Sequence, residues 1–135
     1  MPLTKVTNLG RIIINPSVIS KEILNSATVV NEKLFFATEK GKVIGAPKKV
    51  GLGELSANVK INQLDGKILV TMYIVMNFGA SIKAATDTIL NNLEKSINSM
   101  FPDQNVIVTI KIVGVKSKNI APRDIEVSRE YESSR

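Results

Sequence analysis

The chain has 135 residues, 44% of them hydrophobic, which is enough for one domain with a substantial buried core. It contains no cysteine and no histidine, which excludes a zinc site made from these residues, a thiol nucleophile, disulfide bonds and an imidazole general base. The 18 basic and 12 acidic residues give a net charge of +6, and aromatic residues make up 4% of the chain, which leaves few rings to stack on bases or sugars.

Positive charge is concentrated in the first half of the chain. Residues 1–60 carry nine Lys or Arg and four acids, whereas residues 61–115 carry four of each. No apolar segment of signal-peptide length begins the chain, and the longest apolar stretch, residues 68–76, is far below the roughly 20 residues of a membrane-spanning helix. We therefore expect a soluble protein, and the lack of cysteine is compatible with a reducing cytoplasm.

The first regular elements are a short strand and a helix. A β-branched run at residues 12–14 predicts the strand. Asn15 followed by Pro16 is typical of a helix start, because Asn caps free amides and Pro lacks the N–H that would otherwise be unpaired. The helix predicted over residues 16–27 has Val18, Ile19, Ile23 and Ala27 on one side.

Residues 29–56 show a weaker pattern. Residues 34–38 favour a strand that returns at residues 43–44, and the glycines and proline that follow predict a loop. Gly51 and Gly53 suggest a dinucleotide-binding turn, but the third glycine is replaced by Ser56 and a strand pattern follows instead of a helix. A flexible loop is the preferred interpretation.

A β-hairpin at about residues 57–76 is the clearest local signal. Apolar and polar residues alternate up to residue 62, and residues 68–76 are almost continuously apolar, which is typical of a central strand covered on both sides. Asp65-Gly66 lies between them and favours the positive φ angles of a type I′ turn.

A long amphipathic helix is predicted over residues 81–101. Ser81 provides its N-cap, and Pro102 ends it. Apolar residues at intervals of three or four place one face of this helix on the sheet: Ile82, Ala85, Ile89, Leu93, Ile97 and Met100.

Alternating apolar positions predict a last strand at residues 106–115, and the polar residues 116–135 are expected to form a flexible tail. The fold class expected is α+β. A single domain over residues 1–115 would have a mainly antiparallel sheet, with the hairpin at about 57–76, packed with two α-helices at about 16–27 and 81–101.

Five lysines in residues 33–49 form the best candidate binding site. Together they could contact the phosphates of nucleic acid or anionic lipid, or they could simply be a solvated surface. They are Lys33, Lys40, Lys42, Lys48 and Lys49. The acidic residues form no spacing that indicates acid–base catalysis, so we expect no catalytic residues, no metal site and no cofactor.

Apolar side chains beyond the main stripes are a second candidate. One helix does not easily cover both faces of a sheet, so either the N-terminal helix or a partner subunit must cover the second face. The side chains that would form such an interaction surface are Leu69, Tyr73, Val75, Leu90 and Phe101.

Three segments together resemble the alkaline shock and general stress proteins of Gram-positive bacteria, also called envelope stress response proteins. They are the Gly10–Ile14 run before a helix, the tyrosine-bearing strand that ends at Asn77-Phe78-Gly79, and a valine-alternating strand that ends at Gly114-Val115. The resemblance covers roughly residues 10–115.

The resemblance implies a non-enzymatic cytoplasmic protein of the envelope stress response, with no small-molecule substrate. It further implies self-association into a homo-oligomer and docking to a membrane-anchored protein partner of the same family, at the inner face of the membrane. The alternative, from the residues alone, is a module that binds nucleic acid or an anionic membrane through the lysines of residues 33–49.

Overall fold

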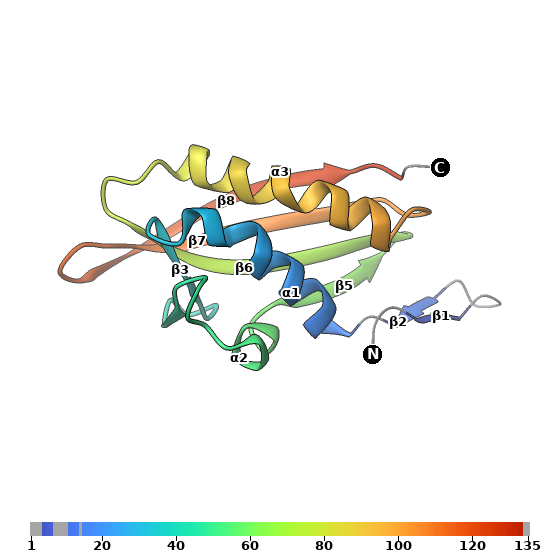
Figure 1. The fold of residues 1–135 in the computed structure, drawn as a ribbon, viewed down its shortest axis with the longest axis horizontal. Coiled ribbons are helices and arrows are strands. Elements are labelled where there is room, and N and C mark those ends of the chain that lie inside the picture. The colour runs from blue at the N-terminus through green and yellow to red at the C-terminus, as the bar shows by residue number, and fades with distance from the viewer. Residues whose placement is uncertain (1–3, 7–10, 14, 134–135) are drawn as a thin grey trace.

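The structure is a computed structural model that describes residues 4–6, 11–13 and 15–133. It has two layers, with helices on one face of a six-stranded sheet (Figure 1). In chain order the elements are β1 (Thr4–Val6), β2 (Arg11–Ile13), α1 (Pro16–Ala27), the 3-10 helix η2 (Thr28–Val30), β3 (Leu34–Ala37), β4 (Val43–Gly45), α2 (Leu52–Ser56), β5 (Lys60–Leu64), β6 (Lys67–Asn77), α3 (Ile82–Met100), β7 (Val106–Lys116) and β8 (Ile120–Tyr131). The predicted α+β class is confirmed.

The large sheet is built around β6. Its strand order is β4-β3-β6-β7-β8, and β5 pairs with the first half of β6. All these pairs are antiparallel except β6–β7, which run parallel from Ile68 opposite Val106 to Asn77 opposite Lys116. The mainly antiparallel sheet is therefore confirmed. The β6–β7 pair is parallel because α3 carries the chain back to the end of the sheet at which β6 begins, and β7 starts from there.

The predicted hairpin is present as β5 and β6. Its two turn residues, Asp65 and Gly66, have φ angles of 52° and 76°, as a type I′ turn requires. The first strand begins at Lys60, a few residues later than the alternation suggested.

Both predicted helices form, with the expected caps. The Asn15 side chain accepts a hydrogen bond from the Ser17 amide at 2.9 Å, and the Ser81 hydroxyl accepts one from the Ala84 amide at 3.1 Å. The helices α1 and α3 lie side by side on one face of the sheet (Figure 1). They bury their apolar stripes against it.

The main core lies between this helix layer and the sheet. Alternate residues of β6 and β7 point into it, because successive side chains of a strand face opposite sides. The largest fully buried side chains are Phe36, Ile19, Ile23, Leu34, Leu55, Ile68, Met72, Ile74, Met76, Ile89, Leu90 and Leu93.

The prediction of a flexible tail over residues 116–135 is wrong for β8. Residues Ile120–Tyr131 pair with β7 along almost its whole length. Ile125, Val127 and Tyr131 pack against the main core from this strand. The apolar alternation of this strand is interrupted at Arg129, which lies between Val127 and Tyr131 on the inward side. Its guanidinium donates a hydrogen bond to the Asn91 side chain of α3.

The remaining short elements surround this frame. The loop predicted after β4 contains α2, which is anchored by the buried side chain of Leu55. The strand predicted at residues 12–14 corresponds to β2, which spans Arg11–Ile13 and pairs antiparallel with β1. Residue 14 lies outside the described residues.

Candidate docking surface

The five lysines predicted to contact polyanions are all exposed. They lie around the β3–β4 hairpin: Lys33 just before β3, Lys40 and Lys42 in the connecting turn, and Lys48 and Lys49 after β4. The structure thus places all five around one hairpin.

The predicted apolar interaction surface is not available in this fold. Leu90 and Phe101 are buried in the main core, and Tyr73 and Val75 are 5% and 0% exposed. Only Leu69 is partly exposed. Burial within the chain itself was the other option that the sequence allowed, and the structure selects it for these four side chains.

None of the described helices lies on the opposite face of the sheet, and we call this face the open face. Its side chains occupy the outward positions of four strands. They include Lys60, Asn62 and Leu64 of β5; Lys67, Leu69, Thr71, Tyr73 and Val75 of β6; Ile107, Thr109 and Lys111 of β7; and Glu126, Ser128 and Glu130 of β8.

The centre of the open face is uncharged. Leu69, Thr71, Ile107 and Thr109 are neighbours in the β6–β7 register and are all partly exposed. Thr109 and Ser128 share a hydrogen bond of 2.9 Å between their hydroxyls. The centre is therefore a flat patch of mixed apolar and hydroxyl character, which suits contact with another protein surface.

Ion pairs lie at the margin of this patch. The Lys67 ammonium is 3.1 Å from the Glu130 carboxylate, and the Lys60 ammonium is 2.5 Å from the Glu39 carboxylate. The hydrogen bond and charge of Lys60 hold the pKa of Glu39 below its ordinary value, and the same contact raises the pKa of Lys60. These side chains remain substantially exposed, so a partner can exchange with either member of a pair.

A small second core stabilises one end of the open face. Ala37, Tyr73 and Val75 are packed together, with Val43 and Val113 at the margin. The Lys60 ammonium lies 5.7 Å from the centre of the Tyr73 ring, and the Lys116 ammonium lies 4.7 Å from that of Phe35. Lysine side chains thus cover aromatic rings that no helix shields.

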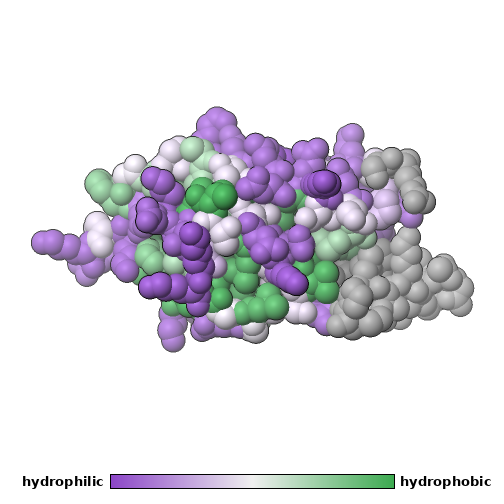
Figure 2. Space-filling view, in the orientation of Figure 1, coloured by the Kyte–Doolittle hydropathy of each residue, from purple (hydrophilic) through white to green (hydrophobic). Residues whose placement is uncertain are grey.

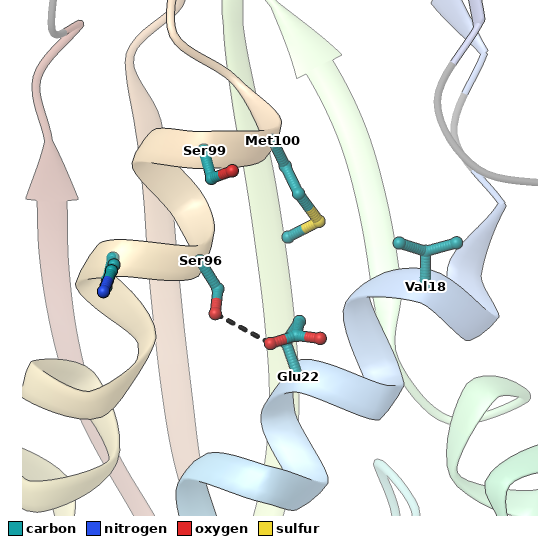
Figure 3. A pocket seen from close by; sticks show the side chains of 6 residues that line it. Val18, Glu22, Ser96, Ser99 and Met100 are labelled. Atoms are coloured by element: carbon teal, nitrogen blue, oxygen red, sulfur yellow. Dashed lines mark hydrogen bonds between the residues drawn. The ribbon is translucent and has the colours of Figure 1, made fainter.

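The helix layer carries its own hollow, of about 370 Å³, between α1 and α3. Figure 3 shows Glu22 of α1 facing Ser96 of α3, whose hydroxyl donates a hydrogen bond of 2.7 Å to the carboxylate. Val18, Ser99 and Met100 line the rest together with Lys95. This polar contact joins the two helices, and sequence periodicity could not have predicted it because it depends on how the helices cross.

The helix-covered side offers mostly polar surface. Figure 2 shows the outer surface of α3 as mainly hydrophilic, with hydrophobic atoms visible between and below the helices. Two large apolar side chains are exposed at the margins of this layer, Val29 of η2 and Leu52 of α2.

Neither layer contains a recognisable metal site within the described residues, where no three acidic side chains come together in the way that a metal ion requires. None of the described helices has the length and hydropathy that crossing a membrane requires.

Comparison with known proteins gives one result. The sequence model of the alkaline shock protein 23 family, described as having a cell envelope-related function, matches residues 4–117. No curated protein and no solved structure matches the chain.

Proposed function

The chain belongs to the alkaline shock protein 23 family, with a cell envelope-related function, and from this premise we propose that it is a non-enzymatic docking protein of the envelope stress response. It acts in the cytoplasm by associating with copies of itself and with a membrane-anchored partner. The observation that carries this proposal is the open face, since the described helices all lie on the other side of the sheet.

The chemistry of the open face supports contact with proteins. Its neutral centre combines apolar contact area with hydroxyl groups that can exchange water for a partner's hydrogen bonds. Four strands at a spacing of about 4.8 Å, each exposing some 20 Å of its length, offer on the order of 300–400 Å² of flat contact. That area is at the low end for a protein interface, so we expect association to be weak and dependent on concentration.

Sedimentation equilibrium over a range of concentrations tests the self-association. The wild-type chain should form dimers or larger species as its concentration rises, and Ile107→Glu should shift it towards monomer, because a carboxylate at the centre of the patch must be desolvated on docking. Val29→Glu, the same kind of change on the helix side, is the control. A wild-type chain that remains monomeric at high concentration contradicts self-association.

Fractionation of the host cells tests the docking to a membrane-anchored partner. Wild-type protein should sediment with the membranes, and Ile107→Glu should move it into the soluble fraction while Val29→Glu does not. Equal distribution of the three proteins would remove the open face from the proposal.

The alternative, binding to nucleic acid or anionic lipid through the five lysines, is favoured by one observation. All five side chains are exposed in the loops around the β3–β4 hairpin. Contacts of this kind would weaken steeply with salt, whereas docking through the neutral centre of the open face would not.

A further inference from the structure

A hollow of about 330 Å³ opens at the end of the open face where β8 begins. Four separate parts of the chain contribute to it: the turn after β3, the middle of β6, the second half of β7 and the start of β8. The lining residues are Glu39, Lys40, Tyr73, Lys111, Val113, Pro122, Arg123 and Asp124.

Cations outnumber carboxylates around this hollow. Lys40, Lys111 and Arg123 line it, and Lys60 reaches its margin through its contacts with Glu39 and the Tyr73 ring. With Glu126, which lies opposite Lys111 in the β7–β8 register, the four cations face three carboxylates, Glu39, Asp124 and Glu126, which leaves a net charge of +1 around the hollow.

Three of these cations act on the same carboxylate. Glu39 has its pKa lowered first by Lys60 and further by the charges of Lys111 and Lys40, so three lysines from three different segments act on the same carboxylate. The Glu39 side chain is 62% exposed. An exposed ion pair of this kind is weak, so an arriving anion can take the place of the Glu39 carboxylate.

The rest of the lining is apolar and fixed. The Tyr73 ring is almost completely buried and forms part of the second core, and Val113 and Pro122 lie beside it. Val113 and Pro122, which are not buried, can contact an apolar part of a ligand, whereas a bare inorganic ion would leave them unused.

We propose that this hollow binds a phosphomonoester, with the phosphate held by Lys111, Arg123 and Lys60 and its organic group against Val113 and Pro122, beside the exposed margin of Tyr73. A phosphomonoester carries a charge between about −1.5 and −2 at neutral pH, so the net positive charge around the hollow attracts it. Arg123, whose Nη1 donates a hydrogen bond of 2.8 Å to the Pro122 carbonyl oxygen, provides its remaining guanidinium N–H groups as donors to phosphate oxygens, and the lysines provide point charges. The site is separate from the neutral centre of the open face and does not depend on the docking function.

Titration of the full chain with phenyl phosphate, followed by NMR and calorimetry, tests the proposal. Saturable shifts should appear at residues 73, 111 and 123, and phenyl phosphate should bind more tightly than inorganic phosphate. The double variant Lys111→Gln and Arg123→Gln should lower the affinity by roughly tenfold or more, since two charge-assisted hydrogen bonds are lost. Lys42→Gln, in the same turn as Lys40 but outside the lining, should leave the affinity unchanged.

Glu39→Gln provides a second test, because it removes the carboxylate that competes for Lys60. It should raise the affinity for phenyl phosphate, and Glu32→Gln, the same change at an exposed position elsewhere, should not. If both changes act equally, or if the double variant and Lys42→Gln behave alike, only general surface charge is involved and the proposal is wrong.

Two sources of the phosphomonoester can be separated by vesicle sedimentation. Phosphatidylcholine vesicles that contain phosphatidic acid carry a phosphomonoester at the lipid surface, and vesicles of phosphatidylcholine alone do not. Retention that needs phosphatidic acid and is lost in the double variant indicates a lipid headgroup. Binding of phenyl phosphate without such retention indicates a small soluble ligand. Absence of binding in both assays overturns the proposal.

Discussion

Tyr131 links the edge strand β8 to helix α3. Its hydroxyl donates a hydrogen bond to the Leu90 carbonyl oxygen, and burial raises the pKa of the phenol to about 12. An unfolded chain would lose this proton near pH 10. The protonated phenol therefore contributes stability that is complete below about pH 10 and is lost as the pH rises to about 12.

Tyr131→Phe should remove this part of the pH dependence. At neutral pH the variant should lose about 1 kcal/mol of unfolding free energy with the hydrogen bond. Between about pH 10 and 12 its stability should fall less steeply than that of the wild type. Urea unfolding at a series of pH values measures both effects, and parallel curves for the two proteins would contradict the assignment.

Gly114 is required by close packing at the bulge between β7 and β8. A Cβ at this position would lie 2.6 Å from Cγ2 of Ile120 and 3.3 Å from the Ala121 carbonyl oxygen. Gly114→Ala should therefore destabilise the protein by about 1–3 kcal/mol.

Thermal unfolding tests this packing. Ile120→Ala in the Gly114→Ala background removes the clashing methyl and should recover part of the loss. Gly51→Ala has open space around its new methyl and should show no loss of this kind. Equal effects of the two glycine substitutions would show that backbone entropy, and not packing, decides.

Among the elements, β8 is the one at which the structure differs most from the sequence-based prediction, which was a flexible tail. Val127 points towards the helix layer and Ser128 towards the open face. Val127→Asn should cost about 1–3 kcal/mol because it places an amide against the core, while Ser128→Asn should change stability by less than about 0.5 kcal/mol. An irregular tail would tolerate both changes equally. Chemical denaturation of the two variants gives the comparison.

Elements whose signals are local could be predicted from the sequence. The caps at Asn15 and Ser81 and the Asp65-Gly66 turn depend on residues next to each other in the chain, and the structure confirms all three. The apolar stripe of α3 likewise appears where its spacing of three and four residues requires.

Signals that depend on distant partners were missed. The alternation of β8 is interrupted by Arg129, whose inward position is explained only by Asn91 and Asp87 of α3. The parallel β6–β7 pair could have been inferred, since a long helix between two strands is typical of a parallel crossover. The hollow around Tyr73 could not, because its cations come from segments that meet only in the folded sheet.

At the scale of the whole molecule, positive charge and docking surface are separated. The lysines of the loops surround the β3–β4 hairpin, whereas the neutral centre of the open face lies on β6 and β7. The candidate interaction surface from the sequence, Leu69, Tyr73 and Val75 with Leu90 and Phe101, shared only the partly exposed Leu69 with that centre. Apolar periodicity indicates which residues are buried, but not whether the chain or a partner buries them.

This separation predicts independent effects of charge and docking. Glutamine at Lys42, Lys48 and Lys49 should lower retention on RNA or on anionic vesicles at low salt, and should leave self-association and stability unchanged, because the three side chains are exposed. The control is a triple variant with glutamine at Lys21, Lys95 and Lys118, which removes three positive charges outside the β3–β4 hairpin. Equal retention of the two triple variants would assign the effect to net charge alone.

The parallel pairing of β6 with β7 also bears on how the chain is made. While the polypeptide leaves the ribosome, β6 has no neighbour on that side until all of α3 and then β7 have followed it. The edge of β7 in turn stays bare until β8 emerges. Long apolar strands with unpaired edges are prone to misassembly. The nascent chain therefore passes through a stage at which it exposes more apolar strand surface for a chaperone to bind than the folded protein does.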